Sequence, residues 1–486
     1  MPPFITFNKV LPGIPNSPFK NAIDWQINKG EIWSVIGKNG SGKSFLSQVV
    51  KGHFILDSGT IEYHFLPKNH HKEGLDLLSG LDRLIRIVSM DSAFKIADYR
   101  QAYYQQRYNN TEVSSVPFVH ELFHPENYES EILDQIVDIF GLDKLMYKRL
   151  IHLSSGELRK FMIARVVLQN PKMIIFDNPF IGLDTKSRDK LEDILLELNQ
   201  LGFQLLFLVP SLNDMPVFTT HLLEIDEGMV VPRGKLGSFQ FIEGNQKHLK
   251  SGIIDWSKIP VHRNPDFEVA VNMESVDITY GSEEVCLHLD WKIKKGEKWA
   301  LLGPNGSGKS TLLSCIFADN PVAYAKNLTL FDRKRGSGES IWEIKERIGF
   351  TSSELHLYYR QNINCREVLE SGFFDSIGVH WKCSKNQAIT ADYLMACLSI
   401  DHLAEKSFLR VSSGEQRMVL FARSLVKNPD LLILDEPFHG FDLANKELCI
   451  SIIDSFCKQQ GKTLIFVTHR REEIPQCIDQ FLDLSR

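Results

Sequence analysis

Short, unbroken runs of apolar residues divide the chain into predicted strands. Met173–Asp177 and Leu431–Asp435 each contain four apolar residues followed by an aspartate, and Gln204–Val209 and Thr463–Thr468 are similar. Such runs, without polar alternation, are typical of parallel strands that are buried on both faces. Together with the helical segments between them, they predict an α/β fold. Ligands of such folds bind at the carboxyl ends of the strands, where both aspartates lie.

The pattern occurs twice, because the two halves of the chain align with each other. The segment Leu153–Glu157 matches Val411–Glu415, and Asp177 matches Asp435, with the same separation of 258 residues. One large duplication explains this constant offset better than a short-period repeat. We therefore predict two domains of one fold and a polar linker of mixed charge between them, at residues 1–242, 267–486 and 243–266 respectively.

Each half also contains a glycine-rich loop that follows an apolar run and precedes a helical pattern. Both loops fit G-x-x-x-x-G-K-[ST], in which backbone N–H groups at a helix N-terminus surround phosphate oxygens. The lysine adds a positive charge, and the last hydroxyl can bind Mg²⁺. Two matches in the same context predict a nucleoside triphosphate substrate. The predicted phosphate-binding residues are Gly37, Lys38, Asn39, Gly40, Ser41, Gly42, Lys43, Ser44, Gly303, Pro304, Asn305, Gly306, Ser307, Gly308, Lys309, Ser310 and Thr311.

Composition limits the partners of the protein. The chain has 486 residues, of which 24% are charged, and its net charge of −6 gives no indication of a nucleic-acid partner. No apolar run approaches the ~20 residues that cross a bilayer, and the N-terminal segment lacks a signal-peptide core. We expect a cytoplasmic protein without direct membrane insertion, so a role in transport would require separate membrane permease subunits.

Taken together, these motifs resemble the ATP-binding subunits of ABC proteins. The resemblance covers nearly the whole chain twice, and it is most specific where one strand ends Asp435-Glu436-Pro437 and the next ends Thr468-His469. The tandem arrangement is also similar to the ModF group of double ATP-binding proteins associated with molybdate transport. The resemblance implies two P-loop NTPase domains, each a mixed, mostly parallel sheet with helices and a helical subdomain. It also implies an ATPase whose two domains, from one chain or from two, close head to tail on ATP and reopen after hydrolysis.

The resemblance assigns roles to further residues in both copies. The implied Mg²⁺ ligands are Ser44, Asp177, Ser310 and Asp435. The serine-rich signatures would each close on the phosphate loop of the other domain; they comprise Ser154, Ser155, Gly156, Ser412, Ser413 and Gly414. Asp184 and Asp442 match an interface loop that communicates between sites, although each could also simply form the turn after its strand.

The two copies differ at residues that would act on the nucleotide. Glu436 is the implied catalytic base, and its counterpart Asn178 has an amide that cannot accept a proton. His469 is implied to contact the γ-phosphate or to position the attacking water, and its counterpart Ser211 cannot supply an imidazole. General-base catalysis contributes ~10²–10⁴-fold, so the first site would lack roughly 3–5.5 kcal/mol of barrier reduction.

A third difference concerns the adenine ring. Tyr280 fits the stacking aromatic of the family, whereas Ile14 aligns with it in the first copy and Phe19 is the substitute that lies nearby. Together the three differences predict one principal hydrolytic site and one degenerate ATP-binding site. The alternative is that all three are tolerated variants and both sites hydrolyse ATP.

One departure from the family affects both copies. The usual glutamine before the helical subdomain is not evident, and Asp91 in one copy and Ser353 or Glu354 in the other stand near its place. Three functions remain open: an engine for transport, with molybdate as the solute that the resemblance suggests; a soluble ribosome-associated ABC protein; and a nucleotide-gated regulatory module without a permease. The short linker of mixed charge disfavours the ribosomal function, because the relatives of that type carry a long basic one.

Overall fold

The structure is a computed structural model that forms two compact units, each described here by itself. The first lies within Met1–Tyr99 and Val116–Asn245, and the second contains Gln246–Arg486. The residues that the structure describes are 1–15, 17–66, 75–89, 117–123, 130–150, 153, 155–237, 254–259, 266–280, 283–317, 319–320, 323, 327–352, 355, 359, 362–377 and 381–484.

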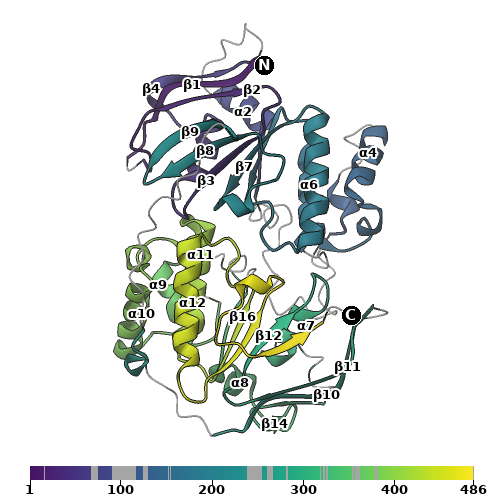
Figure 1. Cartoon of the computed structure of the whole chain (residues 1–486), viewed down its shortest axis with the longest axis vertical. Coiled ribbons are helices and arrows are strands. Elements are labelled where there is room, and N and C mark those ends of the chain that lie inside the picture. Colours follow the sequence, from purple (N-terminus) through teal and green to yellow (C-terminus); the bar gives the residue numbers. More distant parts are fainter. Residues whose placement is uncertain are drawn as a thin grey trace. The chain divides into compact units, whose positions relative to one another are not determined.

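The first unit contains a six-stranded sheet and a smaller three-stranded sheet (Figure 1). In spatial order the six strands are β5 (Ile85–Ser89), β6 (Met173–Asp177), β7 (Gln204–Val209), β3 (Trp33–Gly37), β8 (His221–Asp226) and β9 (Met229–Lys235). All neighbours run parallel except β8 and β9. The antiparallel sheet consists of β2 (Ile23–Asn28), β1 (Pro3–Pro12) and β4 (Leu56–Tyr63). The helices are α1 (Lys43–Val50), α2 (Leu75–Leu84), α4 (Ser130–Phe140), α5 (Ser155–Val167) and α6 (Thr185–Gln200).

The second unit repeats this architecture. Its parallel sheet has the order β15 (Ile348–Ser352), β16 (Leu431–Asp435), β17 (Thr463–Val467), β12 (Lys298–Leu302) and β18 (Gln480–Asp483). The antiparallel sheet has the order β11 (Glu283–Lys294), β10 (Val269–Tyr280), β13 (Leu328–Leu330) and β14 (Arg333–Lys334). The helices are α7 (Lys309–Ile316), α8 (Ile341–Arg347), α9 (Cys365–Glu370), α10 (Lys385–Cys397), α11 (Ser413–Leu425) and α12 (Leu443–Cys457).

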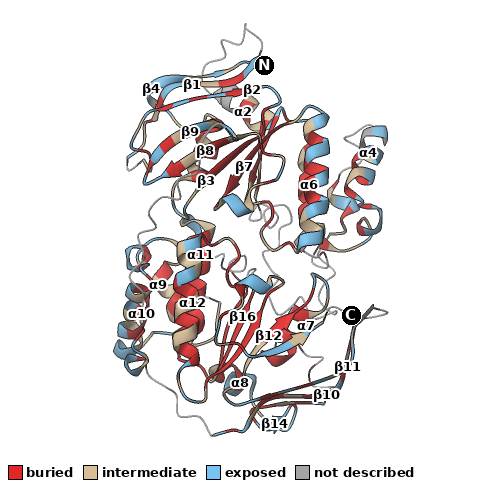
Figure 2. Cartoon of the chain, in the orientation of Figure 1, coloured by how far each residue is buried: buried red, intermediate tan, exposed pale blue. Residues whose placement is uncertain are grey.

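The unbroken apolar runs are central strands with both faces buried, as Figure 2 shows for β7 and β16. Alternate residues of β16 enter different cores: Leu432 and Leu434 pack against the helical side, and Leu431 and Ile433 against the phosphate-loop side. A strand covered on both faces has no side that needs polar residues. This arrangement holds the last residue, Asp435, at the edge where the sheet meets the phosphate loop.

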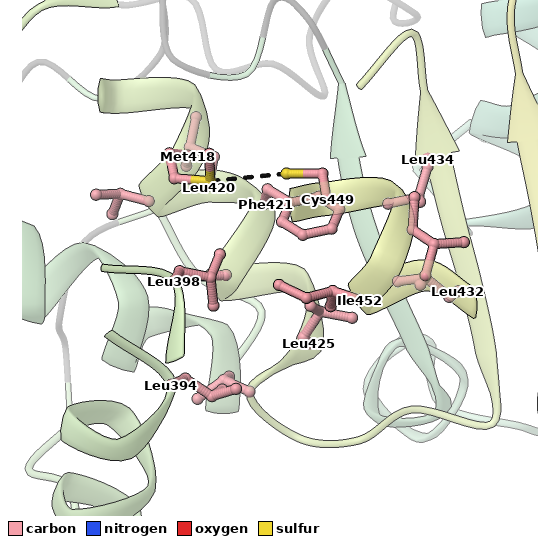
Figure 3. Packing of buried hydrophobic residues seen from close by; sticks show 14 of the residues in the cluster. Leu394, Leu398, Met418, Leu420, Phe421, Leu425, Leu432, Leu434, Cys449 and Ile452 are labelled. Carbon is pink, nitrogen blue, oxygen red and sulfur yellow. Dashed lines mark hydrogen bonds between the residues drawn. The ribbon is translucent and has the colours of Figure 1, made fainter. Parts of the chain in front are cut away.

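The core on the helical side fixes α11 and α12 against β16 (Figure 3). The Cys449 thiol of α12 lies 3.7 Å from the Met418 sulfur of α11, and burial raises the pKa of this thiol. Phe421 and Ile452 fill the space beside this contact. Because buried apolar side chains of this size each contribute about 1.5–3 kcal/mol, these helices are firmly seated on the sheet.

Part of the predicted linker packs onto the second unit. Ile254 and Ile259 belong to its core, and the Trp256 indole donates a hydrogen bond of 2.9 Å to Ser455 of α12. No helix in the described part of the chain has the length and hydropathy of a membrane span. The predicted fold class, a mixed and mostly parallel sheet with helices in each of two copies, is confirmed.

Candidate functional site

Both glycine-rich loops lead directly into the N-terminus of a helix. The residue before each helix is a glycine in the left-handed region, with φ 101° at Gly42 before α1 and φ 87° at Gly308 before α7. Residues with a Cβ rarely adopt this backbone conformation, so glycine permits the turn. A helix N-terminus presents backbone N–H groups and a partial positive charge, which together suit an anion such as phosphate.

The loop lysines have the same contacts in both units. Lys43 Nζ donates to the carbonyl oxygens of Gly37 and Lys38 at 2.5 and 2.9 Å. Lys309 Nζ donates to those of Gly303 and Pro304 at 2.7 and 2.8 Å. Each ammonium therefore caps the first two residues of its own loop. The predicted phosphate-binding loops thus have the same lysine contacts in both units.

The predicted Mg²⁺ ligands also come together in both units. Ser44 Oγ donates to Asp177 Oδ2 at 2.8 Å, and Ser310 Oγ donates to Asp435 Oδ2 at 3.3 Å. Mg²⁺ prefers oxygen ligands and is usually held by one or two protein groups together with substrate phosphates. A hydroxyl and a carboxylate beside a phosphate loop fit that requirement, so either pair could hold Mg²⁺ with ATP.

The units differ at the next residue, although its backbone is the same in both. Asn178 and Glu436 have φ values of 51° and 50°, and their N–H groups donate to Leu208 and Val467 at 2.9 Å. Asparagine tolerates the left-handed region, but for glutamate it is uncommon and costs of order 1–3 kcal/mol. A strained glutamate at this position therefore points to a functional constraint on its carboxylate.

The Glu436 carboxylate is close to two imidazoles. Its Oε1 is 3.0 Å from His469 Nδ1, and its Oε2 is 3.0 Å from His439 Nδ1. Burial would raise the pKa of Glu436, but His439, His469 and the Lys309 ammonium together bring it below the usual carboxyl value. Glu436 is therefore ionised at neutral pH and can accept a proton from water.

His469 retains one nitrogen for a ligand. Its Nε2 is buried and has no hydrogen-bond partner among the described residues, while Nδ1 faces Glu436. A buried polar atom without a partner is costly unless a ligand or water completes it. This arrangement suits a contact with the γ-phosphate or with the attacking water.

The corresponding residues of the first unit offer neither a base nor an imidazole. The Asn178 amide donates to Asp177 at 3.0 Å, and its Oδ1 is buried without a partner in the described part of the unit. The strand pairing overturns Ser211 as the counterpart of His469: Asp177 pairs with Leu208 where Asp435 pairs with Val467, so the equivalent residue is Pro210. Proline has no side-chain donor or acceptor, and the neighbouring Ser211 hydroxyl donates to Asp214 at 2.7 Å. None of these residues offers a group that could take a proton from water at neutral pH.

Of the two residues considered for adenine stacking, the structure describes the side chain of one. Tyr280 ends β10, and its side chain lies outside the described residues. Phe19, the substitute expected in the first unit, is 4% exposed and packs against Phe45 with ring centroids 5.2 Å apart. The suggestion that Phe19 offers a stacking face is therefore wrong in this structure, because the ring belongs to the core. The Phe19 ring also lies against the glycine-rich loop, since a Cβ added at Gly42 would be 3.0 Å from a ring carbon.

The signature and interface residues begin helices. Ser412 caps α11 in a capping box with Glu415, and Ser413 and Gly414 form the first turn. In the first unit Gly156 lies in the first turn of α5, whereas Ser154 and the Ser155 side chain lie outside the described residues. Asp184 and Asp442 each accept a hydrogen bond from the backbone as the N-caps of α6 and α12, at 2.7 and 2.9 Å.

Two groups of residues complete the comparison with the sequence. The positions near the missing glutamine, Asp91, Ser353 and Glu354, lie outside the described residues. His439, in contrast, was not predicted. The signal that could have found it is the alignment of the copies, which pairs His439 with Ile181 three residues after the Glu436–Asn178 difference.

Two phosphate loops, each beside a hydroxyl–carboxylate pair at the end of a parallel sheet, define a tandem P-loop nucleotide-binding protein. The profile of the ABC transporter family matches residues 20–181 and 286–439. The chain thus belongs to the ABC transporter ATP-binding family, with one such domain in each half. It binds ATP and is an ABC-type ATPase, as predicted from the resemblance.

Relatives match over almost the full length of the chain. The ABC transporter ATP-binding protein ModF of Escherichia coli (strain K12) is 32% identical over 94% of this chain and 92% of its own. An uncharacterized ABC transporter ATP-binding protein of Schizosaccharomyces pombe is 26% identical over 95% of this chain and 93% of its own. The predicted similarity to the ModF group is confirmed.

A solved structure has the same fold. A chain from a model of ribosome-bound archaeal Pelota and ABCE1 has a TM-score of 0.57 and 19% identity, and the match covers 94% of this chain and 72% of that one. At this level of identity the likeness concerns the fold alone.

Proposed function

We propose that the protein binds ATP at two sites and hydrolyses it chiefly at one, the site built on the phosphate loop of the second unit. The observation that carries this proposal is the ionised Glu436 carboxylate beside His469, where the first unit has Asn178 and Pro210. Binding and hydrolysis would drive head-to-tail closure and reopening, as in the family.

At the principal site each residue has one task. Lys309 and the N-terminus of α7 bind the phosphates, and Ser310 with Asp435 would hold Mg²⁺, which supplies charge neutralisation on the phosphate oxygens. Glu436 accepts the proton of the attacking water, and His469 Nε2 donates to the γ-phosphate or orients that water. The signature residues Ser154, Ser155 and Gly156 are proposed to complete this site from the first unit.

The first site would retain ATP without efficient chemistry. Lys43, Ser44 and Asp177 repeat the phosphate and Mg²⁺ contacts, with Ser412, Ser413 and Gly414 as the proposed signature. Since general-base catalysis contributes ~10²–10⁴-fold, an asparagine at position 178 leaves a slow site that acts mainly as a second ATP clamp.

We further propose that this cycle powers or regulates transport through separate membrane subunits, with molybdate as the solute that the similarity to the ModF group suggests. The similar solved structure does not support the ribosomal function, because a chain of 19% identity shows similarity of fold alone. With ATP bound but not hydrolysed, the protein should sediment with membrane vesicles that carry its permease and not with ribosomes.

The test is a pair of matched variants. Glu436→Gln gives the second site an amide like that of the first, and we expect it to lower steady-state ATPase activity by about 10²-fold or more while ATP still binds. Asn178→Gln makes the corresponding change in the first unit and should alter the rate by no more than about threefold. A Glu436→Gln protein that kept most of its turnover would show that the base lies elsewhere.

A further inference from the structure

His439 occupies the turn that follows β16. Its N–H donates to Glu436 O at 3.4 Å, and its carbonyl oxygen accepts a hydrogen bond of 3.2 Å from Arg417 of α11. The side chain is only 8% exposed. The turn and α11 together thus fix the backbone of His439 next to the Glu436 carboxylate, with its ring centroid 5.4 Å from that of His469.

The Nδ1 atom of the His439 ring lies close to the Glu436 carboxylate. It is 3.0 Å from Glu436 Oε2 but is not aligned for a hydrogen bond, and it has no hydrogen-bond partner among the described residues. Burial lowers the pKa of His439 to about 4, so the imidazole is neutral at neutral pH. A neutral imidazole can carry its proton on Nδ1. Catalytic hydrogen bonds often align only when the substrate binds, so a small rotation in the ATP-bound state would direct this proton to Oε2.

We propose that His439 is a positioning residue for ATP hydrolysis: it holds the second oxygen of the Glu436 carboxylate, so that this carboxylate faces the attacking water in one orientation. The inference rests on the proposed role of Glu436 as the base. A carboxylate on a short side chain rotates freely unless both oxygens have partners, and a base out of place loses rate steeply.

The first unit supports this role by what it lacks. The position that corresponds to His439 is Ile181, beside the Asn178 amide. An amide that takes no proton needs no second imidazole, and the isoleucine there offers no donor to Asn178 Oδ1, which has no partner among the described residues. The base and its positioning residue therefore differ together between the two copies.

The same three residues could be read as a metal site, since their ligand atoms lie within 4.8 Å of one another. The surrounding charges argue against it. The Lys309 ammonium acts on Glu436 and the Arg417 guanidinium acts on His439, and Glu473 is the one further carboxylate that acts on His439 in the described part of the unit. A divalent cation would meet two positive charges there, whereas a neutral imidazole donor meets no such repulsion.

The test replaces His439 in two ways. His439→Ile copies the first unit, and His439→Asn keeps an N–H donor near the position of Nδ1. We expect the isoleucine variant to lower kcat on the order of 10- to 100-fold with ATP affinity unchanged within about threefold, and the asparagine variant to recover to within about fivefold of the parent protein. Ile181→His in the first unit is the matched control and should leave kcat unchanged.

A second comparison separates this inference from the proposed function. In the Glu436→Gln protein, the further change His439→Ile should lower kcat by less than about twofold, because a residue that acts through Glu436 then has no carboxylate to position. If Glu436→Gln removes activity but His439→Ile does not, the inference alone is overturned. It is also overturned if both His439 variants lose kcat equally, or if they lose ATP affinity as much as kcat. If Glu436→Gln retains activity, the proposed function fails first.

Discussion

In the first unit, Lys43 and the Ser44–Asp177 pair make the contacts that Lys309 and the Ser310–Asp435 pair make in the second. The units differ at the residue after each aspartate: the second unit has a carboxylate hydrogen-bonded to the His469 imidazole, and the first has an amide hydrogen-bonded to the preceding aspartate. The two units therefore share the residues proposed to bind phosphates and differ in the residue proposed to accept a proton.

The difference implies that, on the proposed function, nucleotide binding and proton transfer depend on separate residues, the first on the glycine-rich loop and the second after β16. The backbone after β6 and β16 is the same, with φ values of 51° and 50° and the same hydrogen bond to the next strand. Replacing a side chain there changes the reaction without disturbing the phosphate loop. A duplicated site can thus lose its base and remain an ATP clamp.

The largest effect that would sharpen this comparison comes from the two loop lysines. Lys309→Ala removes charge from the site that has the base, so we expect hydrolysis to fall by about 10²–10³-fold. Lys43→Ala should reduce bound ATP from two molecules per chain to one and lower hydrolysis by no more than about tenfold. ATPase rates and the count of bound labelled ATP measure both outcomes. Equal losses of activity would break the distinction.

A smaller effect concerns the two N-caps, where the units should agree. Asp184→Ala and Asp442→Ala each remove a cap, so each should lower the free energy of unfolding of its own unit by about 1 kcal/mol. Asp→Asn keeps a capping oxygen and should restore that stability. Denaturant unfolding gives the free energies, and unequal losses would show that the two turns differ after all.

The same asparagine variants separate the cap from the role that the family resemblance implies. If the carboxylate communicates across the closed interface, Asp442→Asn lowers ATPase activity while the free energy of unfolding stays unchanged. If Asp442 serves only as a cap, both the ATPase activity and the free energy of unfolding are unchanged in Asp442→Asn.

The features that sequence predicted best are those encoded by neighbouring residues. The phosphate loops could be predicted because glycine, lysine and hydroxyl must stand at a set spacing, and Asp177 and Asp435 because each ends an unbroken apolar run. Glu436 and Asn178 followed from aligning the copies. These predictions needed only local sequence and the rule that ligands bind at the carboxyl ends of parallel strands.

What sequence reasoning missed depended on tertiary packing. Phe19 lies in a proline-containing loop, and the sequence does not determine the path of this loop. The Phe19 ring is buried in the core. His439 reaches Glu436 only because of the turn after β16 and the bond from Arg417. The capping role of Asp184 and Asp442 could have been predicted, because an aspartate directly before a helical pattern is a favoured N-cap.

The most direct test of the account is a single-turnover experiment on the unaltered protein. Both sites are filled with labelled ATP, Mg²⁺ starts the reaction, and samples are quenched to count ADP and ATP per chain. The account predicts one ADP per chain at the steady-state rate while a second nucleotide remains ATP. Two ADP per chain, formed at the same rate, would contradict it.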